Sequence, residues 1–166
     1  MAVIMAFDNS TDLPRKLTRR LGEKPLLSHA LAIVSGAARI KAIVVATDDD
    51  EVALLAERSG VIGLTIDRQK VPNELALANQ VIDLVSPQGL AGDYLLLFSA
   101  PTPLIRSSDL DKAIGLLGRG KADSVVSARR IKQPAWNLKG GVFAGDYDLA
   151  ELNRPEEVEM TEGFIV

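Results

Sequence analysis

Polar and basic side chains follow the first apolar run of the chain, and their types are those that bind phosphate. The run covers residues 3–7, and the segment after it carries Asn9, Ser10, Thr11 and Lys16. Backbone N–H groups, hydroxyls, an amide and an ammonium could together cradle a triphosphate and stabilise negative charge during phosphoryl-group chemistry. The alternative is a solvated surface loop whose basic residues face water. Taken alone, this segment fits both interpretations.

Other residues could also do chemistry, but each has a structural interpretation as well. The acids at residues 48–50 could bind a divalent cation, although acids at the start of a helix more often cap it. His29, the only histidine, is expected to pack or lie on the surface, and Trp136 could stack on a sugar or simply pack. The chain has no Walker loop, no G-x-G-x-x-G and no plausible Ser-His-Asp set. The segment after the first apolar run therefore remains the main candidate.

The order of the apolar runs predicts an α/β fold. Strands are predicted at residues 3–7, 41–46, 61–66, 94–98, 123–128 and 141–144, and helices at 25–38, 52–60, 74–85 and 107–117. Pro25 is expected in the first turn of the first helix, and Ser107 and Ser108 are expected to cap the fourth. Alternation of strands and helices is typical of βαβ units, so we predict a three-layer α/β/α, Rossmann-like domain with a mainly parallel sheet.

Some parts of the chain carry weaker patterns. Gly63 interrupts the third apolar run, residues 8–23 are expected to be mostly irregular, and the acidic tail after residue 144 has little periodicity. No internal repeat or linker interrupts the pattern, so one domain is expected over residues 1–166. In such a sheet, ligands bind outside the carboxyl ends of the strands. The loops at those ends are residues 8–16, 47–50, 67–73 and 99–106.

Composition excludes several classes of protein. A net charge of −3 argues against a general binder of nucleic acid or of an anionic membrane, although a small anionic ligand needs only a local basic pocket. The absence of cysteine excludes disulfides, a thiolate nucleophile and a Cys-based metal site. No apolar run approaches the length of a membrane span and no secretory leader is recognisable, so we expect a cytoplasmic protein.

Taken together, several segments resemble the acylneuraminate cytidylyltransferases, the CMP-sialic acid synthetases. The resemblance runs in order over nearly the whole chain. It begins with a phosphate loop that contains proline and lysine, a helix entry similar to Gly-Lys-Pro-Leu and a turn similar to Ser-Thr-Asp. It continues with a segment similar to Gln-Pro-Thr-Ser-Pro-Leu-Arg, an Asp-Ser-Val-Val-Ser stretch and a strand that forms the floor of the sugar pocket in the family. The matching residues are 5–16, 21–27, 44–53, 96–106, 122–128 and 140–143.

The resemblance implies a fold, a reaction and roles for particular residues. It implies a nucleotidyltransferase domain with a mixed sheet that transfers CMP from CTP to an acidic, acylneuraminate-like sugar, with Mg²⁺ and release of pyrophosphate. Matched positions assign Asn9, Ser10 and Lys16 to the triphosphate, with Lys16 as the catalytic cation. Thr11 is a further nucleotide-binding candidate because of its hydroxyl. Arg68 would contact cytosine, and Ser99 and Thr102 would lie beside the ribose and the acceptor sugar.

The chain also departs from the family pattern. Phe7, Thr11 and Asp12 stand where the family carries an arginine and a lysine–glycine pair, so positive charge is lost and a carboxylate is gained near the phosphates. By Coulomb's law this weakens triphosphate binding wherever the site is partly desolvated. Leu17 replaces an asparagine, and Ser99 replaces a longer glutamine.

Two larger features of the family are missing from this sequence. The insertion between Trp136 and Gly140 that serves dimerisation and sugar binding is absent, so a homo-oligomer is possible but lacks that support. The Asp-x-Asp pair that binds Mg²⁺ does not follow the strand at residues 163–166, so the metal ligands are unknown. These departures keep a second hypothesis open, in which a non-catalytic nucleotidyltransferase-like domain binds a nucleotide or sugar, or serves as a partner domain.

Overall fold

The computed structural model describes residues 1–8, 11–90, 92–120, 122–131, 136–139, 142–145 and 157–166. The chain divides into two compact units, one of Met1–Val126 with Glu162–Val166 and the other of Ser127–Thr161. The expectation of one domain over the whole chain stays a prediction. In the part of the chain that the structure describes, no helix is long and apolar enough to cross a membrane.

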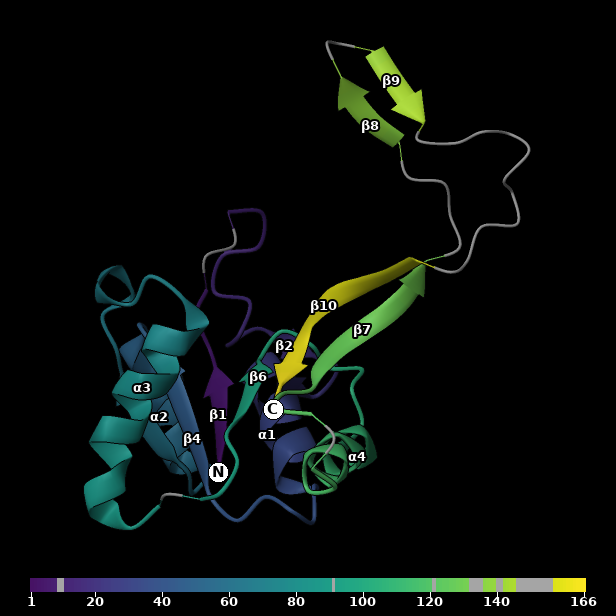
Figure 1. Cartoon of the computed structure of the whole chain (residues 1–166). Helices are drawn as coiled ribbons and strands as arrows, with labels where there is room; N and C mark the ends of the chain where they lie inside the picture. The colour runs from purple at the N-terminus through teal and green to yellow at the C-terminus, as the bar shows by residue number, and fades with distance from the viewer. Residues whose placement is uncertain (9–10, 91, 121, 132–135, 140–141, 146–156) are drawn as a thin grey trace. The chain divides into compact units, whose positions relative to one another are not determined.

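A six-stranded sheet of order β5-β4-β1-β6-β10-β7 forms the centre of the fold (Figure 1). Its strands are β1 (Ala2–Met5), β4 (Ile43–Thr47), β5 (Ile62–Thr65), β6 (Leu96–Ser99), β7 (Val126–Ile131) and β10 (Glu157–Ile165). The strands β5, β4, β1 and β6 pair in parallel, while β10 pairs antiparallel with β6. The prediction of a mainly parallel, mixed sheet is therefore confirmed.

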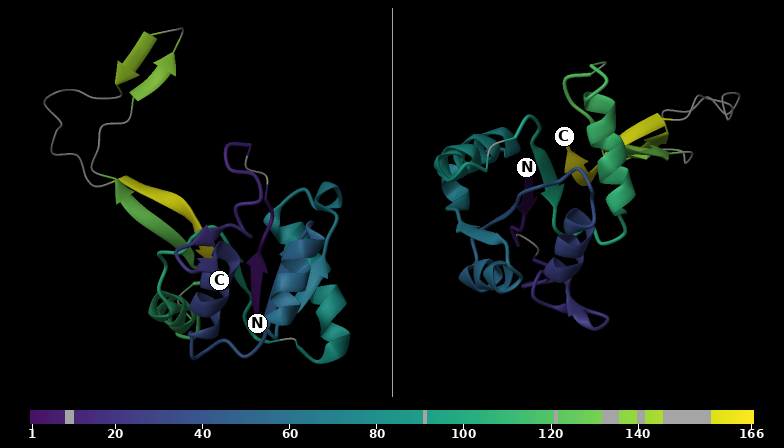
Figure 2. Two further views of the ribbon diagram at one scale, coloured as in Figure 1. Left: turned by 180° about the vertical axis from the view of Figure 1, so that it is seen from behind. Right: turned by 90° about the horizontal axis from the view of Figure 1, so that it is seen from below.

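Helices cover both faces of this sheet. They are α1 (Leu26–Ser35), α2 (Asp50–Arg58), α3 (Glu74–Val85) and α4 (Ser107–Leu117), with short 3₁₀ turns η1 (Arg68–Lys70) and η2 (Ser86–Gln88). Seen along the sheet, α3 lies on one side of the strands, and α1 and α2 lie on the other (Figure 2). The three-layer α/β/α prediction is thus confirmed.

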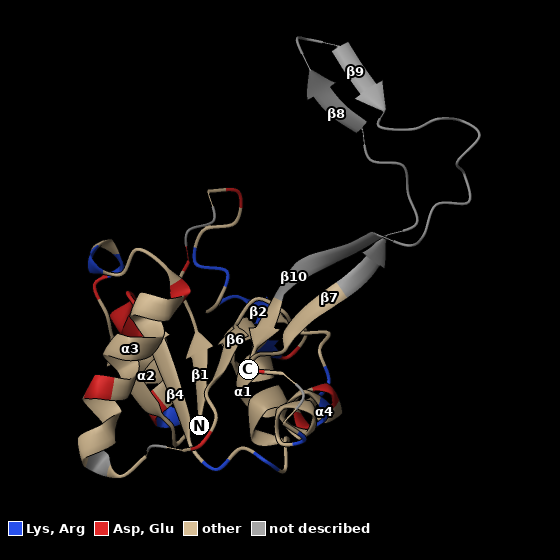
Figure 3. Ribbon diagram, in the orientation of Figure 1, with Lys and Arg blue, Asp and Glu red and all other residues tan. Residues whose placement is uncertain are grey.

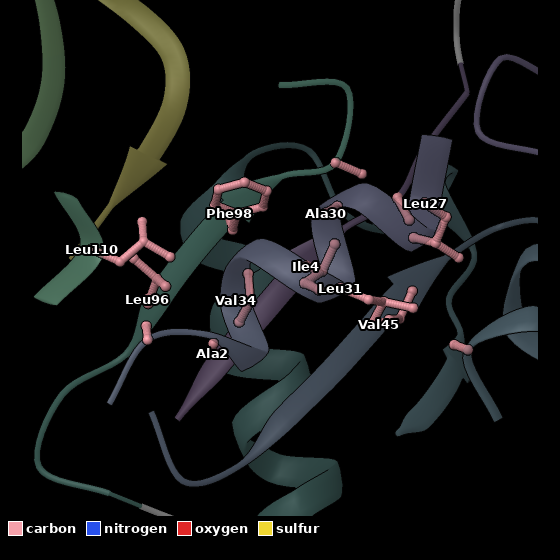
Figure 4. Close-up of a cluster of buried hydrophobic side chains, with 14 of the residues drawn as sticks. Ala2, Ile4, Leu27, Ala30, Leu31, Val34, Val45, Leu96, Phe98 and Leu110 are labelled. Atoms are coloured by element: carbon pink, nitrogen blue, oxygen red, sulfur yellow. The ribbon is translucent and has the colours of Figure 1, made fainter. Parts of the chain in front are cut away.

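Side-chain alternation along the strands creates a separate core on each face of the sheet. In β1, Ala2 and Ile4 pack with α1, α2 and α4, together with Leu96 and Phe98 of β6 (Figure 4). Val3 of β1 instead packs with α3, in a second cluster that also includes Phe7. Because alternate residues of a strand point to opposite faces, Phe7 belongs to the α3 side of the sheet.

Close packing explains why a glycine interrupts the third predicted strand. Gly63 lies inside β5, and a Cβ atom there would be only 2.6 Å from the carbonyl oxygen of Ala53 in α2. The missing side chain therefore lets the helix approach the strand, rather than breaking the strand. This approach fixes the position of α2, whose first turn faces the site described below.

The prediction that residues 8–23 are mostly irregular missed a small hairpin. Strands β2 (Arg20–Leu21) and β3 (Lys24–Pro25) pair antiparallel. Pro25 consequently lies in an extended conformation at the N-cap of α1, not in its first turn. The fourth helix also starts differently, because the hydroxyl of Ser107 donates 2.7 Å to the carbonyl of Ile33 in α1 instead of capping its own helix.

The second unit holds short antiparallel strands. Strand β8 (Trp136–Lys139), which was not predicted, pairs with β9 (Val142–Gly145), which was predicted one residue earlier. Strand β7 begins three residues after the predicted start. Strand β10 was expected only at its end, at residues 163–166, because the charged residues before Gly163 obscure the apolar alternation of the tail.

Candidate functional site

The carboxyl ends of β1, β4, β5 and β6 meet at one edge of the sheet, as expected for parallel strands. At this edge the buried hydroxyl of Thr47, the last residue of β4, donates 2.7 Å to the carbonyl of Ala6, just after β1. On the other side of β1, the N–H of Ala100 donates 3.1 Å to the carbonyl of Met5. The loops that follow these strands are therefore fixed at their starting points.

The loop after β1 carries most of the predicted phosphate-binding residues. Asn9 and Ser10 lie outside the described residues. Thr11 is exposed, and its hydroxyl lies 3.5 Å from a carboxylate oxygen of Asp12. The loop ends on Leu17, a fully buried residue whose carbonyl accepts a 3.0 Å hydrogen bond from the N–H of Leu27 in α1. Leu17 thus anchors the end of the loop to the core.

Lys16 lies immediately before this anchor and is half-buried. Among the described residues, no carboxylate forms an ion pair with its ammonium. Burying part of a charged side chain without an ion pair costs free energy, which an anionic ligand can recover. Lys16 is therefore the residue of this loop best placed to bind phosphate.

The other cations of this segment are held by the protein itself. Arg15 forms an exposed ion pair with Glu51 in the first turn of α2, and its backbone has a positive φ of 57°. The guanidinium of Arg19 donates 3.0 Å to the carbonyl of Pro14. These basic residues form the blue stretch between the loop and β2 in Figure 3. Their charge is engaged in shaping the loop.

The acids after β4 act as a helix cap. The carboxylate of Asp49 accepts hydrogen bonds from the backbone N–H groups of Glu51 and Val52, at 2.7 and 3.4 Å. The N–H of Asp49 in turn donates 3.2 Å to the hydroxyl of Thr47. The capping interpretation is confirmed. Over the residues that the structure describes, no group of three or more acidic or histidine side chains could hold a metal ion.

Arg68 reaches the end of β1 from the loop after β5, two strands away. Its guanidinium lies over the ring of Phe7, with the central carbon 5.0 Å from the ring centroid. One nitrogen of the guanidinium also donates to the carbonyl of Val71 at 3.4 Å. Hydrogen bonds from the Lys70 ammonium and from the N–H of Gln69 lower the pKa of the neighbouring Asp67 carboxyl. Asp67 is thus occupied by Lys70, and it forms no ion pair with Arg68.

Ser99 and Thr102 lie at the end of β6, on the opposite side of β1. Both are half-buried, and the hydroxyl of Thr102 donates 2.6 Å to the carbonyl of Ser99. Leu104, further along the same loop, is 92% exposed. The hydrogen bond of the Thr102 side chain therefore stays within its own loop.

The structure thus brings Lys16 and Arg68 to the same edge of the sheet as Ser99 and Thr102. Other candidates have structural roles or are not described: His29 is bonded to the carbonyl of Leu21 at 2.8 Å, and the side chain of Trp136 lies outside the description. Sequence reasoning missed Glu51 and the contact of Phe7 with Arg68, because both depend on loops that are distant along the chain.

A cavity of about 520 Å³ lies at the opposite edge of the first unit, at the amino ends of the strands. Its lining includes Met1, Arg39, Lys41 and Asp93, and none of the predicted site residues. Ligand sites of α/β sheets lie at carboxyl ends of strands, so we assign the functional site to the loops rather than to this cavity.

Comparison with known proteins gives consistent results. A family profile described as "Cytidylyltransferase" matches residues 1–138. The chain is 28% identical over 141 residues to CMP-N,N'-diacetyllegionaminic acid synthase of Legionella pneumophila, covering 82% of the chain and 60% of that protein. It is 27% identical over 107 residues to 3-deoxy-manno-octulosonate cytidylyltransferase 2 of Hydrogenovibrio crunogenus, covering 63% of the chain and 41% of that protein.

The chain therefore spans less than two thirds of the length of either relative. Among solved structures, it is similar to CMP:2-keto-3-deoxy-manno-octonic acid synthetase complexed with CTP, with a TM-score of 0.71 and 15% identity. That likeness covers 99% of the chain and 72% of the solved one, and at this identity it concerns the fold.

Proposed function

The chain belongs to the cytidylyltransferase family, and on that premise we propose that it transfers the cytidylyl group of CTP to an acidic sugar. A hydroxyl oxygen of the sugar attacks the α-phosphorus of CTP in line. The new oxygen–phosphorus bond forms as the bond between the α-phosphorus and the bridging oxygen breaks. The hydroxyl proton is lost, and pyrophosphate leaves with the electrons of the broken bond.

The observation that best supports this proposal is the partial burial of Lys16 together with its unpaired charge among the described residues. Lys16 is half-buried at the carboxyl edge of β1, and no carboxylate among the described residues neutralises its charge. Its neighbour Arg15, in contrast, is paired with Glu51. A fixed ammonium beside the triphosphate stabilises the negative charge that develops on the leaving pyrophosphate.

The proposed acceptor site lies at the end of β6, beside Ser99 and Thr102. The Thr102 hydroxyl donates to the Ser99 carbonyl, so its oxygen presents lone pairs to a ligand and the Ser99 hydroxyl is available as a donor. An acidic sugar is supported by the two relatives, which are named for an octulosonate and for a legionaminic acid. An acylneuraminate-like sugar is our specific proposal within this class.

Mg²⁺ belongs to the proposal through the resemblance alone. The described residues contain no cluster of three possible ligands, so they do not form a cage for the ion. Mg²⁺ in nucleotide sites is usually held by substrate phosphates with one or two carboxylates, which makes CTP its expected carrier.

Transfer is tested by measuring pyrophosphate release from CTP, with ATP as the comparison nucleotide and with octulosonate, legionaminate and sialate as acceptors, each with Mg²⁺. We expect release only with CTP and one of the acids. Lys16→Met should weaken CTP binding roughly 10- to 100-fold, because a hydrogen bond to a charged group contributes about 1.5–3 kcal/mol. The matched control is Lys112→Met, an exposed lysine paired with Asp109 on α4, which should leave binding unchanged.

A second candidate function is nucleotide binding without transfer. It is favoured by the charge of the loop, where Arg15 is neutralised by Glu51 and Asp12 adds an exposed carboxylate. Calorimetric binding of CTP with no pyrophosphate release for any acceptor would establish this function. Failure of the protein to bind CTP at all would reject both candidates.

A further inference from the structure

The contact between Phe7 and Arg68 is the starting point of the inference. Phe7 is the second residue after β1, and Arg68 opens the turn η1 after β5. The guanidinium lies over the ring at 5.0 Å from its centroid, and both side chains are half-buried. A cation over an aromatic face is attracted by the ring quadrupole, and arginine also stacks flat on such a ring. Because β4 lies between β5 and β1, the Arg68 side chain spans the end of β4 to reach Phe7 after β1.

The charges around Arg68 indicate the role of its guanidinium. Asp67, next to it in sequence, is paired with Lys70, so Arg68 forms no ion pair among the described residues. In the loop after β1, Arg15 is paired with Glu51 and Asp12 is negative. Lys16 is the half-buried cation of this loop without an ion pair among the described residues, and a triphosphate carries several negative charges. Arg68 comes from the loop after β5 and contacts Phe7 at the start of this loop, so it brings a second positive charge close to the proposed phosphate site.

We infer that Phe7 is a positioning residue that holds Arg68 as a second phosphate-binding cation of the nucleotide site. This inference rests on the proposed function, because it assumes that the site binds CTP. The contact with the ring limits where the guanidinium can lie, and one of its nitrogens donates to the carbonyl of Val71. The remaining N–H groups of an arginine form a planar fork that matches phosphate oxygens.

The test is a double-mutant cycle with Phe7→Leu, Arg68→Met and the double variant, each titrated calorimetrically with CTP and with inorganic tripolyphosphate. Leucine keeps an apolar side chain in the core and removes the π-face. We expect Phe7→Leu to weaken binding of both ligands about 2- to 30-fold, the range of a cation–π contact. In the Arg68→Met background the same substitution should have no further effect, because the partner is gone.

Phe7→Tyr is the rescuing variant, since it keeps the ring and should bind CTP as the unmodified protein does. Thermal melts of all variants check that they fold. Three results would overturn the inference: equal losses from Phe7→Leu with and without Arg68, unchanged tripolyphosphate binding in Arg68→Met, or unchanged CTP binding in Phe7→Leu. If the unmodified protein binds no CTP, the proposed function fails together with the inference. Binding that is insensitive to this pair rejects the inference alone.

Discussion

The two sides of β1 differ in how their loops are held. On the β4 and β5 side, the hydroxyl of Thr47, the ion pair of Arg15 with Glu51 and the stacking of Arg68 on Phe7 each join one loop to another. On the β6 side, the loop is joined to β1 by a backbone hydrogen bond from Ala100 to Met5, and the side chain of Thr102 bonds within the loop, to the carbonyl of Ser99. On the side assigned to the nucleotide, side chains therefore join different loops to one another. On the side assigned to the acceptor, the Thr102 side chain bonds within its own loop.

This difference between the two sides indicates which side chains must be ordered before a ligand binds. A charged ligand such as a triphosphate is bound best by groups that are already fixed in place, because ordering long side chains on binding costs entropy. A loop with few connections to its neighbours can change its contacts without disturbing the rest of the site. The proposed division into a rigid nucleotide half and an adaptable acceptor half makes the following predictions.

The largest effect is expected where the support of the β4 and β5 side is removed. Gly63→Ala places a Cβ 2.6 Å from the Ala53 carbonyl oxygen, so α2 must shift. Such overpacking lowers the free energy of unfolding by about 1–3 kcal/mol, measured by urea denaturation. Gly115→Ala in α4 is the matched control, since its Cβ would meet no atom within 4 Å. It should raise stability by roughly 0.5–1 kcal/mol, and a loss of the same size in both variants would contradict the packing argument.

A second prediction compares the two threonines directly. Thr47→Val leaves the buried carbonyl of Ala6 without its hydrogen bond and should lower the free energy of unfolding by about 1–3 kcal/mol. Thr102→Val removes a half-buried hydrogen bond inside one loop and should cost only about 0.5–1.5 kcal/mol. Urea midpoints of the two variants give the comparison. A larger loss for Thr102→Val would reverse the proposed order of rigidity.

A smaller effect is expected at Arg15, where backbone strain and an ion pair oppose each other. Arg15→Gly relieves the positive φ of 57°, which costs an L-residue about 1–2 kcal/mol, and loses an exposed ion pair worth about 0–1 kcal/mol. We expect the free energy of unfolding to rise by up to about 1 kcal/mol once the entropy of glycine in the unfolded chain is included. Glu51→Gln keeps the strain and loses only the pair, so its thermal midpoint should fall slightly. A fall of the Arg15→Gly midpoint would show that the ion pair dominates.

The smallest effect concerns Asp67, beside the stacked arginine. Its carboxyl has a pKa below the ordinary value of 3.8, because it accepts hydrogen bonds from Lys70 and Gln69. A depressed carboxyl pKa stabilises the folded state above pH 3.8, and this contribution disappears as the pH falls through the lower, folded-state pKa. Asp67→Asn should therefore be slightly less stable at neutral pH and equal to the unmodified protein in acid. A stability difference that persists in acid would point to a cause other than ionisation.

Periodicity was sufficient to predict the parts of the fold that depend on local pattern. The helix at residues 74–85 was predicted with the bounds of α3, and the parallel core strands were found within a few residues. The family resemblance is confirmed by the cytidylyltransferase profile. Because the carboxyl ends of parallel strands share one edge, the sequence alone is enough to predict that Lys16, Arg68, Ser99 and Thr102 lie at one edge of the sheet.

The features that the sequence did not predict depend on contacts between segments that are distant along the chain. Gly63 weakened the pattern of the third strand, although that strand was predicted, because the reason for the glycine is the nearby backbone of α2, which no local pattern records. Phe7 suggested only a loss of charge, since the arginine that stacks on it comes from a loop about sixty residues later. The roles of the site residues, the cytoplasmic location and the oligomeric state stay predictions. These residues are Asn9, Ser10, Thr11, Lys16, Arg68, Ser99 and Thr102.

The hydrogen bond from Ser107 to Ile33 also bears on the order of folding. It joins residues 74 positions apart, and Asp111 accepts from the N–H groups of Ala38 and Arg39 over 73 and 72 positions. The end of α1 thus becomes complete only after α4 has been synthesised and has closed a long loop, which is entropically costly and slow. During synthesis, β1, β4 and α2 can assemble well before α4 emerges. The paired backbones of β1 and β4 should therefore be protected from hydrogen exchange on a nascent chain that is still too short to contain α4.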